Sequence, residues 1–233
     1  MTGLRPAAKL AELRNRPLPG ESAAYAEARK ALLAEEIAVR RHLTRLAEQR
    51  QALPDGPVVQ EDYRFRDASG KEVGLIDLFG ERDSLVVYFQ MYGPERAQPC
   101  PMCTNFIAGV SGNVVDIQQR AAFKVAARSP VERQQAVAQD RGLPPIDFVQ
   151  SLGDAFAIDH GALDPDDGAE SPALIVFRRD GDVVRYFYAA EMPAEAADPG
   201  QDPRGPVDIA PLWNVLDLTP QGRGADWYPK VHY

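Results

Sequence analysis

Both cysteines of this 233-residue chain lie in one short segment, YGPERAQPCPMCTNFIAG at residues 92–109. Cys100 and Cys103 are two residues apart, after the apolar run SLVVYFQM and before a segment with helical spacing of apolar residues. A cysteine at the start of a helix lies beside unpaired backbone N–H groups, which stabilise its thiolate. The second cysteine of a C-x-x-C pair is one turn away, close enough to form a disulfide. The spacing predicts thiol–disulfide exchange.

The positions of the two thiols predict different roles. Cys100 precedes the helix, so we expect a lowered pKa and a nucleophile that reacts first. Cys103 lies one turn into the helix, where Phe106 and Ile107 crowd it, and we expect it to be shielded and to act as the resolving thiol. Pro101 fits the first helical position, where no helical hydrogen bond is lost.

Two other interpretations of the cysteine pair stay open. A zinc site needs two further ligands, and the three histidines, His42, His160 and His232, lie in unrelated segments. We therefore predict no metal site and no cofactor, with His42 on a helix surface and His160 in a loop. The remaining alternative is a pair of buried cysteines that only fill space.

Charge and hydropathy exclude several functions. Residues 1–53 carry a net charge of +4 and the remainder −12, within a total of −8. An acidic body offers little to replace phosphate counterions, so we expect no nucleic-acid partner. The N-terminus lacks the apolar core of a signal peptide, and the apolar runs are too short to span a bilayer. We expect a cytoplasmic protein without membrane partners, in which the thiols are reduced at rest.

Residues 1–53 are predicted to form an N-terminal helical arm. From Ser22, a suitable N-cap, to Pro54 the chain holds no internal Pro or Gly and is rich in Ala, Leu, Glu and Arg. Apolar side chains recur every seven residues along this helix, which makes one narrow stripe: Tyr25, Leu32, Val39, Leu46 and Leu53. The stripe packs either on the chain's own second domain or on a second copy, and a homodimer through this helix is our prediction.

Residues 54–233 are predicted to form an α/β domain. A hairpin turns at ASGK and leads into a short helical turn at GLIDLFG, and SLVVYFQM reads as a buried strand. AAFKVAA predicts another strand, SPVERQQAVAQDRG a helix, and PALIVFRRDGDVVRYFYAA a second hairpin. A Pro-rich loop and a last apolar segment, IAPLWNVLDLTP, complete the chain. This order predicts a mixed central sheet with flanking helices.

The order CxxC helix, strand, helix, X-Pro hairpin and terminal helix resembles a thioredoxin fold. The helix AEEIAVRRHLTRLAEQRQALP, the segment GLIDLFGERDSLVVYFQMYGP, CPMC and NVLDLTPQGRG together resemble the bacterial thioredoxin-like family called domain of unknown function 899, over residues 22–228. The resemblance implies a cis-proline loop facing the CxxC helix. Pro172 opens a strand in that place, so we expect a cis Ser171–Pro172 bond and a Ser171 backbone that binds substrate by β-addition.

The lead-in hairpin also resembles peroxiredoxins, but the peroxidatic motif of that family is incomplete. Ala97 stands three residues before Cys100 where Thr or Ser is usual, and Gly93 stands where the proline belongs. We therefore favour exchange with protein or small-molecule disulfides. A thiol peroxidase and a non-enzymatic redox-sensing or binding module remain alternatives. No buried carboxylate is identified as a proton acceptor, and Glu95, Arg96 and Arg128 are expected to be structural or exposed.

Overall fold

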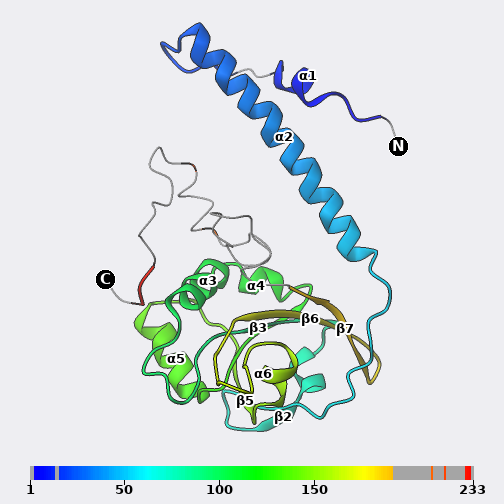
Figure 1. The fold of residues 1–233 in the computed structure, drawn as a ribbon, viewed down its shortest axis with the longest axis vertical. Helices are drawn as coiled ribbons and strands as arrows, with labels where there is room; N and C mark the ends of the chain where they lie inside the picture. Colours follow the sequence, from blue (N-terminus) through cyan, green and yellow to red (C-terminus); the bar gives the residue numbers. More distant parts are fainter. Residues whose placement is uncertain (1–2, 14–15, 191–210, 212–217, 219–228, 232–233) are drawn as a thin grey trace. The chain divides into compact units, whose positions relative to one another are not determined.

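The protein was studied as a computed structural model, which describes residues 3–13, 16–190, 211, 218 and 229–231 (Figure 1). The chain divides into two compact units, residues 1–54 and 55–233. In the part of the chain that is described, no helix combines the length and the apolar character that a membrane span requires.

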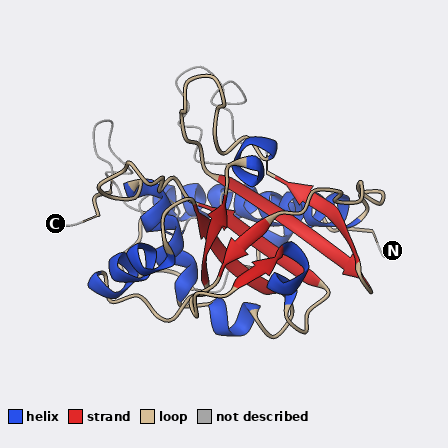
Figure 2. Cartoon of the chain, turned by 90° about the horizontal axis from the view of Figure 1, so that it is seen from below, coloured by secondary structure: helices blue, strands red, loops and turns tan. Residues whose placement is uncertain are grey.

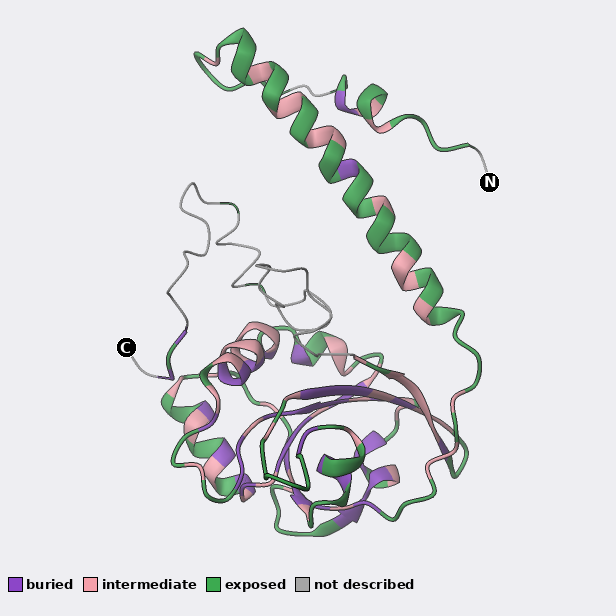
Figure 3. Cartoon of the chain, in the orientation of Figure 1, coloured by how far each residue is buried: buried purple, intermediate pink, exposed green. Residues whose placement is uncertain are grey.

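The first unit pairs a short helix, α1 (Ala7–Ala11), with the long helix α2 (Ala23–Gln51). The Ser22 hydroxyl accepts a hydrogen bond from the Tyr25 N–H at 3.2 Å, so the predicted N-cap is confirmed. Ala11 and Ile37 are buried in this unit. Two members of the apolar stripe on α2 lie largely in solvent. Leu32 and Val39 are 59% and 56% exposed, and Figure 3 shows α2 as mostly exposed.

The second unit contains a seven-stranded mixed sheet with the strand order β2-β1-β5-β4-β3-β6-β7. Strands β5, β4 and β3 run parallel to one another, and the neighbouring pairs on both sides are antiparallel. The strands are β1 (Arg64–Arg66), β2 (Glu72–Gly74), β3 (Ser84–Phe89), β4 (Ala122–Ala127), β5 (Phe148–Leu152), β6 (Ala173–Asp180) and β7 (Val183–Ala189). Three parallel central strands between antiparallel edges, with a CxxC helix after β3, make a thioredoxin-like fold, as the sequence predicted.

Helices cover both faces of this sheet (Figure 2). The 3-10 helix η1 (Leu75–Phe79) and α6 (Ala155–Asp159) pack into the core of one face, around Phe65, Phe156 and Phe177. On the other face, α3 (Pro101–Ser111), α4 (Val114–Ile117) and α5 (Val131–Asp140) enclose a second core. Because successive residues of a strand point to opposite faces, β3 contributes alternately to the two cores.

The structure adds elements that the sequence pattern did not reveal. β5 and α6 were not predicted, and they lie between the predicted helix α5 and the final hairpin. The two predicted hairpins, the turn at η1, the strands β3 and β4 and the helix α5 are present. The last apolar segment, residues 209–220, falls almost entirely outside the described residues.

Candidate redox site

Cys100 lies at the junction between the loop that follows β3 and helix α3. Its backbone has φ −59° and ψ 129°, so it precedes the helix as the N-cap, and Pro101 takes the first helical position. The Cys100 N–H donates to the Met91 carbonyl oxygen at 3.0 Å. The Thr104 N–H and hydroxyl both donate to the Cys100 carbonyl oxygen at 3.0 Å. Both backbone polar groups of Cys100 are thus hydrogen-bonded, which fixes its position at the start of α3.

The two thiols differ in accessibility. Cys100 is partly exposed, whereas Cys103 is 1% exposed and packs with Ile107 in the second core. Both are free thiols in this structure. A disulfide in solution can therefore meet Cys100 but not Cys103, which matches the shielding that the sequence predicted.

Hydrogen bonding lowers the pKa of Cys100 to about 6. The largest cause is the hydrogen bond from the Cys103 thiol, followed among the stabilising groups by the backbone N–H groups of Cys103 and Met102 and the positive charge of Arg96. Burial acts in the opposite direction. The predicted direction is thus found. The neighbouring thiol, which the sequence argument left out, outweighs the N–H groups of the helix end.

The pKa of Cys103 is raised well above its usual range. The hydrogen bond to Cys100 and burial are the main causes, since each favours the neutral thiol. Hydrogen bonds from the Tyr88 hydroxyl and the Met91 N–H favour the thiolate but are smaller effects. In the reduced protein one proton is therefore held on Cys103 and pointed at Cys100.

A buried carboxylate holds Arg96, whose charge acts on Cys100. Arg96 Nε donates to Glu170 Oε2, and the Glu170 side chain is only 8% exposed. Glu170 Oε1 also accepts from Arg128 Nη1 at 3.5 Å, and Arg128 Nε donates to Asp154 at 2.8 Å. Glu170 thus joins the loop before CPMC to the segment after β4. Arg128 is held in ion pairs, as a structural residue would be, whereas Arg96 also acts on the pKa of Cys100, which the sequence did not predict.

Gly93 permits this close approach. A Cβ added at Gly93 would overlap the Glu170 carboxylate and come within 3.2 Å of Arg128 Nη1. The loop backbone and the buried acid are therefore packed directly against each other. The residue that departs from the peroxidatic motif thus has a packing role in this chain.

The start of α5 holds the same loop from the other side. Arg133 Nη1 donates to the Pro94 carbonyl oxygen at 3.0 Å, Nη2 donates to the Arg96 carbonyl oxygen, and the guanidinium lies over the Tyr92 ring at 4.8 Å. The Ser129 N–H donates to the Tyr92 carbonyl oxygen at 2.8 Å. The loop therefore has a fixed course between β3 and Cys100.

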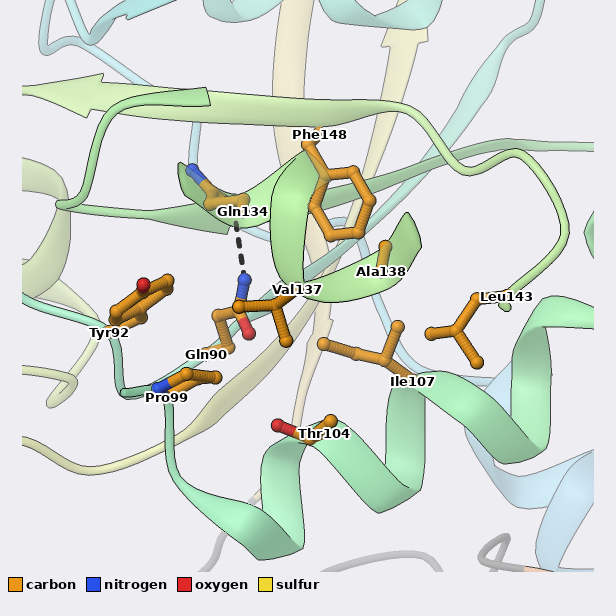
Figure 4. A pocket seen from close by; sticks show the side chains of 10 residues that line it. All are labelled: Gln90, Tyr92, Pro99, Thr104, Ile107, Gln134, Val137, Ala138, Leu143 and Phe148. Carbon is orange, nitrogen blue, oxygen red and sulfur yellow. Dashed lines mark hydrogen bonds between the residues drawn. The ribbon is translucent and has the colours of Figure 1, made fainter. Parts of the chain in front are cut away.

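A small cavity lies between α3 and α5 (Figure 4). Its volume of about 10 Å³ is close to the space that one water occupies. Gln90 Nε2 donates to Gln134 Oε1 at 3.1 Å across its edge, and Gln134 Nε2 donates to the Ser129 and Val149 carbonyl oxygens. These buried amides tie the loop to α5 and β5, so the cavity belongs to the support of the site.

A larger hollow adjoins the loop on its solvent side. Its volume is about 590 Å³, and it is bounded by the loop before CPMC and by the segment that leads to β6. Charged side chains from these two segments and from the ends of β4 and β5 line it, namely Glu95, Arg96, Arg128, Asp154, Asp164 and Glu170. Arg96 links this hollow to the thiol, because it lines the hollow and its charge acts on Cys100, whereas neither cysteine lines the hollow.

The predicted cis-proline is wrong, because the described residues contain no cis peptide bond and Ser171–Pro172 is trans. A trans bond is favoured by about 0.5–1 kcal/mol, and a proline before the first residue of a strand needs no turn that would reverse this preference. Ala173 pairs with Phe89, so Pro172 does lie at the sheet edge from which the CPMC loop departs. The Ser171 N–H already donates to the Ala162 carbonyl oxygen at 3.1 Å.

The structure also places two of the three histidines, His42 and His160. His42 is exposed on α2, as expected. His160 lies in the turn that follows α6, as expected, where it is the C-cap of that helix and its ring is 4.2 Å from that of Phe156. Within the described ranges, no group of three or more His, Cys, Asp or Glu side chains could hold a metal ion. Tyr88 and Glu170 were not predicted, because their partners are remote in sequence and leave no local pattern.

One family model, described as "Bacterial protein of unknown function (DUF899)", matches residues 15–233. The chain belongs to this family. A comparison with curated proteins gives no match. The family description names no activity, so membership of the family shows a relationship in sequence and no reaction.

Solved structures with a similar arrangement are distant in sequence. A cysteine-to-serine mutant of PrxQ from Xylella fastidiosa is 14% identical, with a TM-score of 0.44, over 62% of this chain and 91% of that one. The peroxidoxin BcpB from Mycobacterium tuberculosis is 18% identical, with a TM-score of 0.42, over 59% and 88%. A thiol:disulfide interchange protein from Bacteroides sp. is 12% identical, with a TM-score of 0.43, over 73% and 95%.

Proposed function

We propose that this member of the DUF899 family is a thiol–disulfide oxidoreductase that uses Cys100 as nucleophile and Cys103 as resolving thiol. The observation that carries the proposal is the contrast within the CPMC pair. One thiol is accessible, with its pKa lowered to about 6, and the other is buried one turn away and holds a proton. Two cysteines that merely filled space would both be buried and neutral.

The reaction begins when the Cys100 thiolate attacks a sulfur of the substrate disulfide. A mixed disulfide forms, and one substrate half leaves as a thiolate that takes a proton from water. Cys103 then attacks the Cys100 sulfur, the second substrate half leaves, and Cys100 and Cys103 are joined by a disulfide. The substrate gains two electrons and the protein loses two. An external thiol reductant restores the reduced pair.

We place the part of the substrate that does not react in the hollow of about 590 Å³ beside Arg96. The backbone at Ser171 and Pro172 is proposed to bind an extended substrate at the adjacent sheet edge. Because the Ser171 N–H is occupied, only its carbonyl oxygen is free of that bond to serve in β-addition. A substrate strand that pairs only with this carbonyl oxygen is held by fewer hydrogen bonds than one that also accepts from an N–H group. We therefore propose that the substrates include small disulfides as well as proteins.

The compartment follows from the same chemistry. A CxxC pair that cycles needs a steady supply of thiol reductant, which the cytoplasm provides. We therefore retain a cytoplasmic location as part of the proposal. Separate fractionation of cells, with the protein detected by antibody, tests this location independently of the activity.

Turnover by the purified full-length chain tests the proposed activity. With dithiothreitol as reductant, the protein should reduce insulin disulfides faster than dithiothreitol alone. Cys100→Ser should abolish this gain. Because the chain has only two cysteines, Cys103→Ser should accumulate a mixed disulfide at Cys100 that mass spectrometry detects.

The same protein is then tested against hydrogen peroxide. Consumption of peroxide with no disulfide exchange would replace our proposal with the thiol peroxidase, in which Cys100 passes through a sulfenic acid. Reversible oxidation of the pair with neither activity would identify a redox-sensing module. In both cases the exchange function is rejected.

A further inference from the structure

The Tyr88 side chain is directed from the central strand β3 to the buried thiol. Its neighbours Val87 and Phe89 point into the core on the opposite face of the sheet, whereas Tyr88 belongs to the same core as Cys103. Tyr88 is 5% exposed, and its ring lies 4.3 Å from that of Phe106, one turn beyond Cys103 on α3. Its hydroxyl group therefore faces the turn of α3 that holds Cys103, and the two groups affect each other's pKa.

We propose that Tyr88 is a catalytic residue of the second half of the reaction, where its hydroxyl donates a hydrogen bond to the Cys103 thiolate as that sulfur attacks the mixed disulfide. This inference rests on the proposed exchange function and adds a residue to it. It assigns Tyr88 no part in the attack by Cys100.

Formation of the mixed disulfide changes the surroundings of Cys103. In the reduced protein the Cys103 thiol donates to the Cys100 thiolate, and this bond is the largest cause of the raised pKa of Cys103. A Cys100 sulfur in a disulfide carries no negative charge, so that cause disappears. Burial still opposes a Cys103 thiolate, and the groups that favour it are the Tyr88 hydroxyl and the Met91 N–H.

Tyr88 acts as a donor and not as a base. Burial and the adjacent thiols raise the pKa of its phenol well above the usual range, so the hydroxyl keeps its proton throughout. The buried Glu170 carboxylate is already paired with Arg96 and Arg128, so the proton of Cys103 passes to water. The Tyr88 hydroxyl takes no proton and stabilises the thiolate that remains.

The step is balanced without another reactant. Cys103 loses its proton to water, its sulfur bonds to the Cys100 sulfur, and the bond between Cys100 and the substrate sulfur breaks. The electron pair of that bond leaves with the substrate thiolate, which accepts a proton. Tyr88 keeps its own proton and provides only the hydrogen bond.

A stopped-flow reaction with 2,2′-dithiodipyridine separates the two steps. Attack by Cys100 releases one pyridinethione, and attack by Cys103 releases a second. In Tyr88→Phe the ring and its contact with Phe106 remain, and only the hydroxyl is lost. We expect an unchanged first phase and a second phase slower by about 10- to 100-fold, the size of one hydrogen bond to a charged group. The apparent pKa of the second phase should rise.

Tyr63→Phe is the matched control. Tyr63 is a buried tyrosine, 3% exposed, that belongs to the core on the other face of the sheet. Loss of the Tyr63 hydroxyl should leave both phases of pyridinethione release unchanged. An unchanged second phase in Tyr88→Phe, an equal slowing of both phases, or the same slowing in Tyr63→Phe would overturn the assignment of Tyr88.

Failure of the exchange function itself gives a different result. A wild-type protein that releases only one pyridinethione has no resolving thiol, whatever Tyr88 does. Tyr88→Phe with a normal first phase is folded at the site, so a slower second phase in that variant cannot come from unfolding.

Discussion

The pH profile of Cys100 reactivity tests the electrostatics of the site most directly. The suitable protein is Cys103→Ser, which has one thiol and keeps a hydroxyl where the main hydrogen-bond donor stood. With a pKa of about 6, roughly nine-tenths of Cys100 is thiolate at pH 7, against about 3% for a thiol at the unperturbed value of about 8.5.

The gain in rate is smaller than the gain in thiolate. A thiolate of lower basicity is a weaker nucleophile, and a Brønsted coefficient of about 0.4–0.5 over roughly 2.5 pKa units slows it about 13-fold. The approximately 30-fold gain in thiolate at pH 7 therefore leaves only about a twofold advantage. At about pH 5.5 the advantage over an unperturbed thiol rises to roughly 20-fold, and above about pH 9 Cys100 becomes about 10-fold slower.

The assay is the second-order rate with a small disulfide from acidic to basic pH, with the ultraviolet absorbance of the thiolate as a direct measure. Cys103→Ser should give half of its plateau rate near pH 6. Cys103→Ala lacks the donor that contributes most, so its midpoint should move upward. A midpoint of about 8.5 in Cys103→Ser, or equal midpoints for the Ser and Ala variants, would refute this account of the nucleophile.

Three further outcomes follow from the contacts around the site. Arg96→Gln should raise the pKa of the nucleophilic thiol, but by less than loss of the Cys103 donor, because the Arg96 charge is the smaller cause; the same pH titration measures it. Gly93→Ala should lower the free energy of unfolding by about 1–3 kcal/mol in urea titrations, because its Cβ overlaps the buried Glu170 carboxylate. Leu46→Asp should dissociate the homodimer predicted from the α2 stripe. If the wild-type protein sediments as a monomer at ~10–50 micromolar, the predicted homodimer is wrong.

The parts of the fold that the sequence predicted have strong local signals. CPMC at the end of an apolar strand, Pro101 at the helix start and the Asp180–Gly181 turn of the last hairpin each have a local physical cause. β5 was missed because its five residues, FVQSL, follow a Pro-rich stretch and show no strict alternation. This strand is stabilised by its neighbours β1 and β4 in the sheet, which a single-sequence pattern does not reveal.

The same distinction applies to the site. The identities of the two thiols and the direction of the pKa of Cys100 followed from the CxxC spacing. The pairing of Arg96 with Glu170 spans 74 residues, and the contact of Tyr88 with Cys103 depends on how β3 packs on α3. Such contacts exist only once the sheet has formed. The cis bond expected before Pro172 was wrong for the opposite reason. It was taken from the resemblance to the thioredoxin fold, although the local structure at Pro172 does not require it.

The reactivity of Cys100 consequently has a fixed part and a part that depends on packing. The Cys103 donor and the N–H groups at the start of α3 come with the CPMC helix itself, so they persist wherever that helix forms. The Arg96 charge is different, because its place depends on Glu170, which is held in turn by Arg128 and by the absence of a side chain at Gly93. Arg96 and Glu170 also line the hollow of about 590 Å³. A molecule bound there would contact the Arg96–Glu170 pair, and it would leave the Cys103 donor and the N–H groups of α3 unchanged.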